Sequence, residues 1–444
     1  MGLKNSSIMP RLSSSEPPRK GLFPKIKERV PYITRRLFLA EYSLLRFPWT
    51  ANNEFEVLDK MRKLSLAQGR KCQARSDVFL SIFWPLQSLI ASTIFLWKNG
   101  KDTKKICKIS LRKQFKQSFL LSIRHNIPAE FYYELRAWQH YDNAHLYVHM
   151  YEHAFLCQWL NTGKNVKTID DKLIFFEACV DRNVATVPII ACLNPEGPSN
   201  SPIVWYQDPV LPAEDLYFKP TGGKCGQGIQ RWKYDLNAQQ WRRGVLSLDQ
   251  AELIAYQIKR SSRRSLSSPI VVQCRQRNHP DWAKFSEGSL CSLRVVTYYL
   301  SDSFEPKLLL TAFRMPVGDK AVDNLHAGGI AAGVDQNGVL GAARTLDVGG
   351  GIHTHHPGTG AVLEGATLPH YEDLVNLALS AHKAFREFKS VGWDLVLSES
   401  GPRILEGNLG WCTSIVQMAN DKPLGSTDYP RIFVDHLCSL SQPK

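Results

Sequence analysis

Two carboxylates and an amide lie close together in residues 391–408, which read VGWDLVLSESGPRILEGN. The apolar segments DLVLSE and RILEGN are separated by the turn sequence SGP, which predicts an antiparallel hairpin. Asp394 then begins the first strand, and Glu406 and Asn408 end the second on a shared face. Carboxylate and amide oxygens are the ligands that Mg²⁺ takes while it holds substrate phosphates. The pattern therefore predicts a magnesium site, with a solvated strand end as the alternative.

A glycine-rich loop occurs earlier, in residues 216–232, which read LYFKPTGGKCGQGIQRW. An apolar strand ends in Lys219 and Pro220 and a second strand opens near Ile229, which predicts a hairpin rather than a turn from strand to helix. Glycine lets the backbone approach a ligand, so such a loop offers N–H groups to a polyphosphate. No GxxxxGK[ST] and no helix-opening GxGxxG is present, so neither a P-loop nor a dinucleotide fold is indicated. An ordinary glycine-rich hairpin is the other interpretation.

The elements that must position these residues belong to a chain of two unlike parts. Its 444 residues, 22% charged and 43% hydrophobic, allow two or three domains. Positions 1–150 hold 26 Lys and Arg against 11 Asp and Glu, whereas the remainder holds 29 against 30. Ten cysteines without a CxxC pair argue against a zinc ribbon and a disulfide scaffold, and the first twenty residues lack the apolar core of a secretory signal. We therefore expect a cytoplasmic protein with a basic front and a charge-balanced body.

An uncharged apolar run, VFLSIFWPLQSLIASTIFLW, occupies residues 78–97 of the basic front. As a helix it would rise about 30 Å, the thickness of a bilayer core. Pro85 interrupts it and Lys and Arg flank both ends, so the positive-inside rule chooses no orientation. A segment that kinks at Pro85 and contacts anionic head groups on the inner face of the cell membrane fits these flanks better than a simple span. A span and a buried core helix are the alternatives.

The basic excess could also bind nucleic acid, but no zinc finger, RNP-like string or leucine heptad accompanies it, so this partner is not favoured.

Between residues 111 and 170, apolar side chains recur at four-residue steps, as at Tyr147, Tyr151 and Phe155. This spacing predicts helices, broken near Pro128, that form a collar ahead of the body.

An ordered series of motifs connects the two hairpins. The chain reads DKLIFF at 171, LYFKPTGGKCGQGI at 216, VVQC at 271, SLRVVT at 292, DNLHAGGIAAGVD at 323, HPGTG at 356 and GWDLVLSESGPRILEGN at 392. This succession, which covers roughly positions 110–440, resembles the ATP-grasp superfamily, and more narrowly its sugar-transfer-associated branch, relatives of the alpha-L-glutamate ligases. The resemblance implies an α+β fold in which two α+β lobes clamp ATP.

The expected domains follow from this resemblance and from the basic front. They are a basic N-terminal region (1–110) with the apolar segment, a helical collar (111–170), a small lobe with the glycine-rich flap (171–270) and a core lobe with the metal site (271–444).

The resemblance also implies roles for residues of the small lobe. Lys172 and Lys219 match the two lysines that contact ATP. Val272, Gln273 and Cys274 match the hinge strand whose backbone meets adenine, although Gln273 stands where many relatives carry an acidic residue. The flap that would close over the phosphates contains four glycines: Gly222, Gly223, Gly226 and Gly228.

In the core lobe the resemblance implies the groups that act on the reacting atoms. Arg294 would direct its guanidinium at the transferring phosphate or the substrate carboxylate, and Arg314 would do similar work. Asn324 matches the stretch beside the metal, and His326 would face the acyl acceptor. The implied Mg²⁺ ligands are Asp394, Glu406 and Asn408, with Glu406 as the bridge between two ions.

These assignments imply a ligase that joins a small-molecule carboxylate to an amine or sugar acceptor. The carboxylate would attack the γ-phosphate of ATP, and an amine or related nucleophile would then displace phosphate from the acyl phosphate. The family name points to polysaccharide or surface-glycan biosynthesis, and a membrane-contacting front would bring the enzyme near lipid-linked sugars. A phosphotransferase acting on a hydroxyl group and a non-catalytic, membrane-associated ATP-binding adaptor are the alternatives.

Three histidines, His353, His355 and His356, form a separate cluster between glycine-rich stretches. They could bind a transition metal, but most loop histidines of this kind bind none. A contact between His356, with its HPGTG turn, and the acceptor is the other interpretation.

Overall fold

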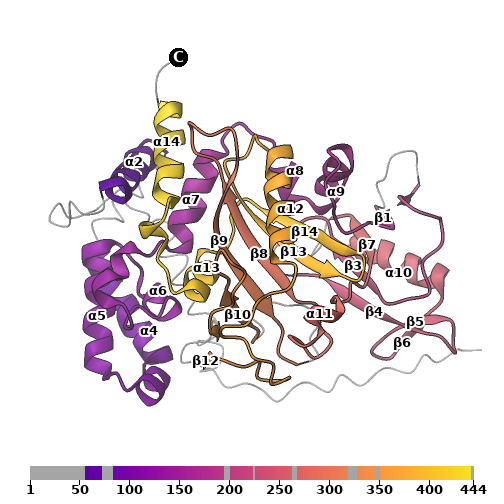
Figure 1. The fold of residues 1–444 in the computed structure, drawn as a ribbon, viewed down its shortest axis with the longest axis horizontal. Helices are drawn as coiled ribbons and strands as arrows, with labels where there is room; N and C mark the ends of the chain where they lie inside the picture. The colour runs from indigo at the N-terminus through magenta and orange to yellow at the C-terminus, as the bar shows by residue number, and fades with distance from the viewer. Residues whose placement is uncertain are drawn as a thin grey trace, which may run out of the picture.

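The computed structural model describes residues 56–72, 84–194, 201–223, 226–262, 268–318, 328–345 and 351–441. Two of the proposed catalytic residues, Asn324 and His326, lie outside these ranges. Figure 1 shows a group of helices on one side, a sheet in the centre and a second sheet on the far side. The molecule is an α+β protein, as the sequence predicts.

The first sheet has seven strands in the order β2-β1-β7-β3-β4-β5-β6, and every neighbouring pair is antiparallel. Its strands are β1 (Ala191–Leu193), β2 (Ile203–Trp205), β3 (Leu216–Pro220), β4 (Gln230–Asp235), β5 (Gln240–Arg243), β6 (Leu246–Leu248) and β7 (Ile270–Cys274). The predicted glycine-rich hairpin is confirmed, because β3 pairs directly with β4. The predicted lobe boundary after residue 270 passes through β7, which is a central strand of this sheet.

The helix α10 (Gln250–Ser261) covers one face of the first sheet. A capping box starts it: the Asp249 carboxylate accepts from Glu252 N at 2.9 Å, and the Glu252 carboxylate accepts from Asp249 N at 3.1 Å. Leu253 of the helix packs into the same core cluster as Phe218 and Trp232 of the strands. The flap hairpin therefore belongs to a small, self-contained packing layer.

The second sheet also has seven antiparallel strands, in the order β12-β11-β10-β9-β8-β13-β14. They are β8 (Ser292–Tyr298), β9 (Lys307–Met315), β10 (Ile330–Gly333), β11 (Ala343–Thr345), β12 (Ile352–His353), β13 (Ser390–Ser398) and β14 (Gly401–Asn408). Alternate residues of β8 enter different core clusters: Leu293 enters one and Val296 the other. Both faces of this sheet are therefore buried.

The two faces of the second sheet are covered by different helices. α12 (Tyr371–Ala384) packs on the face that carries Leu293. The opposite face is covered by α7 (Met150–Leu160), α13 (Thr413–Asn420) and α14 (Tyr429–Ser441). Close packing at this face requires glycine at 392, because a Cβ there would lie 2.5 Å from Cβ of Trp411.

The predicted collar is helical. It contains α5 (Leu111–His125), α6 (Ala129–Glu134), the 3₁₀ helix η3 (Tyr141–Leu146), α7 and α8 (Lys167–Asp170), and α9 (Lys172–Asp181) follows. The break between α5 and α6 comes at left-handed Asn126 and at Pro128, as expected. Short helices α11 (Pro280–Ala283) and η6 (Leu424–Ser426) complete the core lobe.

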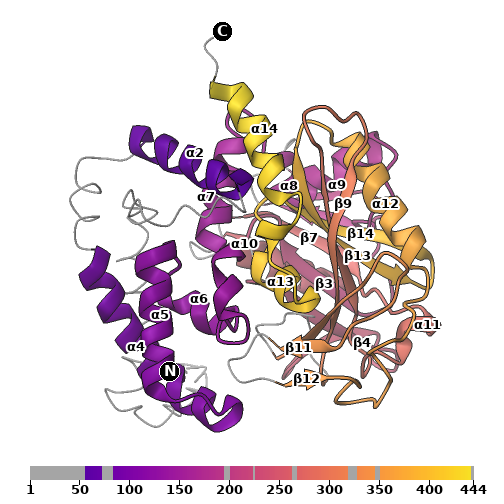
Figure 2. The same cartoon turned by 60° about the vertical axis from the view of Figure 1, so that its left-hand side comes forward.

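Part of the basic front packs against the body. α2 (Glu56–Cys72) crosses α14, as Figure 2 shows, and its Leu58 and Met61 join the core cluster of α7 and α14. Its Arg62 pairs with buried Glu152 at 2.9 Å. The predicted N-terminal region therefore contains a segment that is structurally continuous with the core lobe.

The apolar run enters the structure at residue 84. Its described part, residues 84–97, begins the helix α4 (Trp84–Cys107), which packs on α5 and α6 through Trp84, Ala91 and Phe95. Pro85 lies in the first turn of α4 rather than at a kink. Proline has no backbone N–H, and residues in the first turn of a helix need none for the helical hydrogen bonds. Among the described residues, no helix is both long and apolar enough to cross a bilayer.

Candidate active site

Four charged side chains form a row across neighbouring strands of the second sheet. Asp394 of β13 lies opposite Arg294 of β8 on one side and opposite Glu406 of β14 on the other. Arg314 of β9 pairs with Ser292, two residues from Arg294. The residues next to them in sequence, such as Leu293, Phe313 and Trp393, pack on the face that α12 covers. Successive side chains of a strand point to opposite faces, so the charged side chains share the face that is covered by α13 and the collar.

The hairpin that carries Asp394 and Glu406 forms as predicted, with a different position for Asp394. β13 begins at Ser390 and pairs with β14 up to Ser398 opposite Gly401. Asp394 therefore lies in the middle of its strand rather than at the start, because the preceding SVGW segment is apolar enough to extend the strand. It still lies level with Glu406, so the predicted proximity of the two carboxylates holds.

Asp394 is held by two arginines. Arg294 binds it in a bidentate way, with Nε donating to Oδ1 and a terminal nitrogen donating to Oδ2 at 2.9 Å, and Arg314 reaches Oδ2 at 3.1 Å. All three side chains are buried. Burial would raise the pKa of Asp394, but the two positive charges outweigh it and lower this pKa to about 2. The guanidinium groups are thereby fixed in place.

Glu406 and Asn408 complete the donor set that was predicted for a metal. They share a face of β14, and Asn408 Nδ2 lies 3.4 Å from Glu406 Oε1. Burial and the neighbouring Asp394 charge raise the pKa of Glu406, and the charges of Lys172 and Arg294 oppose the rise. Two carboxylates in direct contact require a proton or a cation between them. Glu406 and Asn408 would suit a magnesium ion, and Asp394, whose two oxygens already accept from the guanidinium groups, would add to its negative surroundings.

Lys172 connects this row to the flap. It is the first residue of α9, which Asp171 caps by accepting from Leu173 N and Ile174 N. Its backbone N–H donates to Thr221 O, and its ammonium group lies 3.3 Å from Gly223 O. The same ammonium group contributes to the charge that Glu406 experiences. The Lys172 side chain therefore contacts the glycine-rich loop and also opposes the rise in the pKa of Glu406, the carboxylate that was predicted to bind a metal.

The flap adopts a conformation that only glycine adopts easily. Gly223, Gly226 and Gly228 all have positive φ, between 72° and 101°. The loop is anchored at its base, because Gly222 N donates to the hydroxyl of Ser268 at 3.2 Å. Lys219 is half-buried on β3, with its ammonium group 5.7 Å from the ring of Tyr217.

The predicted hinge strand, β7, is paired with β3 throughout and with β1 as far as Val272. The carbonyl of Val272 accepts from Ile190 N at 2.8 Å, so sheet pairing uses it. Gln273 is buried, and its amide donates to Val187 O at 3.2 Å. Val187 N in turn donates to Ile404 O of β14. The end of β7 therefore lies at the junction of the two sheets, two residues along β14 from Glu406.

The three clustered histidines have separate environments. His356 is buried: its Nε2 lies 3.0 Å from Pro316 O, and its Nδ1 accepts from Gly358 N and Thr359 N. It fixes the HPGTG turn to the end of β9. His353 belongs to β12, and exposed His355 lies beside the hydroxyl of Thr354. Among the described residues, these histidines do not gather into a metal-binding group.

The collar contributes a residue that the sequence did not single out. Glu134 ends α6 and is close enough to raise the pKa of Cys412, which immediately precedes α13 and also feels Arg294. Burial is the main cause that raises the pKa of Glu134 to about 7; the hydroxyl of Ser414 opposes it. An acidic residue at a helix C-terminus gave no sequence signal, because only the tertiary fold brings α6 to the β14–α13 junction.

Glu134→Gln is expected to make the protein more stable at pH 8 by about 3 kcal/mol, with little effect at pH 4.5. The folded-state pKa of about 7 exceeds the ordinary value of 4.5, so the wild type loses stability as the pH rises through this interval. Glutamine cannot ionise and removes that loss. Urea unfolding from pH 4.5 to 8.5 measures it; parallel curves for the two proteins across this range would contradict the assignment. Glu399→Gln, at an exposed turn, is the matched control.

Comparison with known proteins identifies the family of this chain. The family model of the sugar-transfer-associated ATP-grasp proteins matches residues 152–428, which include both sheets and every described residue of the row. The chain belongs to this family. Its fold is accordingly the ATP-grasp fold, and in this chain the first sheet carries the glycine-rich hairpin and the second sheet carries the charged row.

Solved structures resemble this ATP-grasp chain only distantly. An L-amino acid ligase from Bacillus licheniformis has 9% sequence identity and a TM-score of 0.29, covering 55% of this chain and 41% of its own. A D-alanine–D-alanine ligase from Bacillus anthracis has 14% identity and a TM-score of 0.33, covering 62% and 69%. D-alanyl-alanine synthetase A from Vibrio cholerae has 10% identity and a TM-score of 0.34, covering 61% and 64%. The chain therefore spans less than half of the first ligase. No curated protein matches the sequence.

Proposed function

We propose that this ATP-grasp protein is an ATP-dependent ligase that activates a carboxylate as an acyl phosphate and transfers it to an amine or a related nucleophile. The observation that carries the proposal is the row Arg314, Arg294, Asp394 and Glu406, with Lys172 linking it to the flap. Phosphoryl transfer requires cationic groups, a carboxylate that can bind a metal ion, and a loop whose backbone N–H groups can contact phosphate. The row and the flap supply all three.

The chain's own residues would divide the work as follows. Lys172 and Lys219 would bind the phosphates of ATP, with the flap glycines closing over them and excluding water from the acyl phosphate. Arg294, held rigid by Asp394, would offset the charge of the transferring phosphoryl group. Glu406 and Asn408 would hold Mg²⁺, which supplies Lewis-acid stabilisation of the phosphate oxygens when bound.

The acceptor would enter from the collar side of the row. Glu134 lies close enough to Cys412 to raise its pKa, and its carboxyl oxygens suit the N–H groups of an amine or amino sugar. Thr413 supplies a buried hydroxyl in the first turn of α13 that has no hydrogen-bond partner among the described residues. The family name supports a carbohydrate acceptor in polysaccharide or surface-glycan biosynthesis.

Trapping with hydroxylamine tests the activation step without knowledge of the acceptor. The full-length protein with Mg·ATP and hydroxylamine is presented with a panel of amino acids and uronic acids. An acyl phosphate yields a hydroxamate in amounts equal to ADP. ADP released with a hydroxyl compound, together with a stable phosphoester and no hydroxamate, would identify a phosphotransferase instead.

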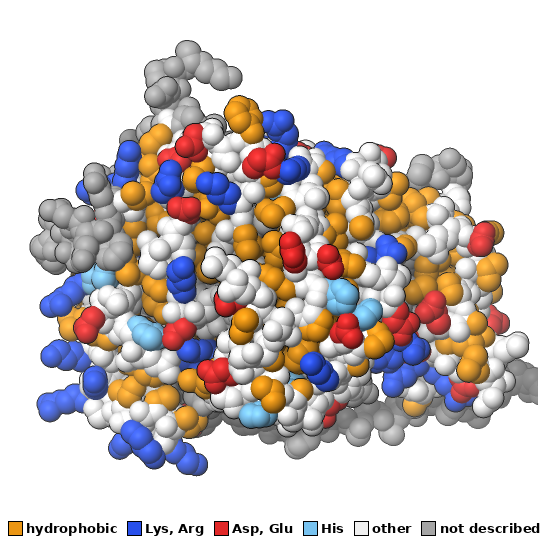
Figure 3. Space-filling model, viewed as in Figure 1, with side chains coloured by type: hydrophobic (Ala, Val, Ile, Leu, Met, Phe, Trp, Pro, Cys, Tyr) orange, Lys and Arg blue, Asp and Glu red, His pale blue; other side chains and the backbone are white. Residues whose placement is uncertain are grey.

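We also propose that α4 attaches the enzyme to an anionic membrane surface. One face of this helix carries Leu86, Leu89, Ile90 and Trp97, which are between 42% and 56% exposed. The same face continues into basic residues, Lys101, Lys104 and Lys105. Lys and Arg gather over α4 and α5 at the lower left of Figure 3, beside hydrophobic side chains. This combination suits insertion of the apolar turn beneath anionic head groups.

Leu89→Glu is expected to weaken binding to phosphatidylserine-containing vesicles by about tenfold or more, because the substitution removes buried apolar area and adds a repelled charge. The double variant Lys104→Glu with Lys105→Glu should lose more vesicle binding at low salt than at high salt, because salt screens the attraction between lysines and anionic head groups. Sedimentation with vesicles measures both. Val245→Glu, in the exposed turn between β5 and β6, is the control and should bind vesicles as the wild type does. Equal vesicle binding by Leu89→Glu and wild type would refute the attachment.

A further inference from the structure

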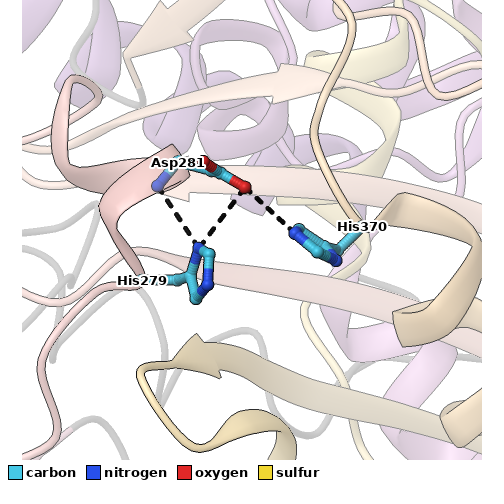
Figure 4. Close-up of side chains that lie close together, drawn as sticks. All are labelled: His279, Asp281 and His370. Carbon is cyan, nitrogen blue, oxygen red and sulfur yellow. Dashed lines mark hydrogen bonds and ion pairs between the residues drawn. The ribbon is translucent and has the colours of Figure 1, made fainter.

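A second group of potential metal ligands lies away from the charged row. His279 precedes α11, Asp281 belongs to it, and His370 precedes α12, as Figure 4 shows. Asp281 Oδ2 lies 3.0 Å from His370 Nε2 and 3.4 Å from His279 Nδ1, and all three potential ligand atoms lie within 4.8 Å of one another. α12 covers the face of the second sheet opposite to the row, so this group is separate from the candidate active site.

His370 lies between two carboxylates. Its Nε2 faces the carboxylate of Asp281, and its Nδ1 faces the carboxylate of Asp373 at 3.3 Å. A neutral imidazole carries one N–H, so one of its nitrogens would direct a lone pair at a carboxylate oxygen. The side chain makes no capping hydrogen bond to α12 that would account for this orientation.

His279 also contacts Asp281. Its Nδ1 accepts from Asp281 N at 3.3 Å, and Asp281 Oδ2 lies 3.4 Å from the same nitrogen. A cation bound at this nitrogen would take its lone pair from the Asp281 N–H and would attract the carboxylate oxygen.

The scaffold around the group is fixed by bonds that do not involve the three side chains. Trp282 is buried and its indole N–H donates to Pro369 O at 3.1 Å, which places His370 beside α11. The backbone of His279 donates to Leu397 O at 2.9 Å. The ligands are therefore brought together before any ion binds, which lowers the entropic cost of binding.

We propose that His279, Asp281 and His370 bind a divalent transition metal of the zinc class, with water in the remaining position. Nitrogen and carboxylate ligands at about 2.1 Å in tetrahedral geometry lie about 3.4 Å apart, close to the two separations observed around Asp281. Asp373 would accept from His370 Nδ1–H and orient the ring, as carboxylates do for metal-bound histidines. The ion would tie α11 to α12 across 89 residues of chain and stabilise the core lobe.

Zinc titration of the full-length protein tests the site. Calorimetry is performed in excess Mg²⁺, which occupies oxygen-ligand sites, and thermal unfolding is followed with and without Zn²⁺. The wild type is expected to bind one zinc ion that raises the unfolding temperature. His279→Ala and His370→Ala should each weaken this binding at least about 100-fold, and Asp373→Asn about 10- to 100-fold.

Co²⁺ supplies an independent readout, because a tetrahedral site gives a visible absorption band that His370→Ala should abolish. His355→Ala removes an exposed histidine outside the group and should change nothing. Zinc affinity that is equal in wild type, His279→Ala and His370→Ala would overturn the proposal.

Discussion

Glu406→Gln is expected to reduce ADP release by at least about 100-fold while the protein remains folded. The substitution keeps the size of the side chain and removes the carboxylate that faces both Asp394 and Lys172. Without it, the site has no second carboxylate for Mg²⁺, and the transferring phosphate loses part of its charge compensation. Steady-state ADP release with saturating ATP measures the effect.

Glu399→Gln is the matched control for this prediction. Glu399 lies at the turn of the same hairpin, exposed and remote from the row. This variant should keep wild-type activity, and both variants should unfold at nearly the same temperature as the wild type. Glu406→Gln with more than half of the wild-type rate would show that the row is structural rather than catalytic.

Asp394→Asn is expected to destabilise the protein by about 3 kcal/mol or more. Asparagine removes the carboxylate that the buried guanidinium groups of Arg294 and Arg314 share and leaves the two positive charges close together. Urea unfolding at pH 7 without nucleotide or Mg²⁺ measures the loss. Glu387→Gln breaks the partly exposed ion pair with Arg182 and should cost at most about 0.5 kcal/mol.

The pH dependence of this difference has a definite sign. The pKa of Asp394 is lowered from its ordinary value of 3.8 to about 2, so its contribution to stability is complete above about pH 5 and is lost as the pH falls through this interval. The gap in stability between wild type and Asp394→Asn should therefore shrink as the pH falls from about 4 toward 2. A gap that stays constant down to pH 2.5 would contradict the ion-pair assignment.

The two hairpins could be predicted from sequence because their signals are local. A strand, a glycine-rich turn and a second strand follow one another within residues 216–232, and the same holds for residues 391–408. The predicted proximity of Asp394 and Glu406 followed from strand register alone. The family resemblance supplied the fold, which no local pattern determines.

Other features could not be predicted because they depend on contacts between distant segments. Arg294 was expected to face substrate, and its bidentate bond to Asp394 depends on β8 pairing with β13 a hundred residues later. Glu134 approaches Cys412 and Ser414 only because the tertiary fold brings the end of α6 to the start of α13. The ion pair between Arg62 of α2 and Glu152, and the position of β7 between β1 and β3, likewise depend on contacts between segments that are distant in sequence.

ADP release by the full-length protein with Mg·ATP, against amino acids, uronic acids and amino sugars presented singly and in pairs, tests the proposed ligase activity most directly. We expect turnover that requires a carboxylate and an amine together and that disappears in Glu406→Gln. Turnover with a lone hydroxyl compound, or tight ATP binding without turnover for any pair, would contradict the account.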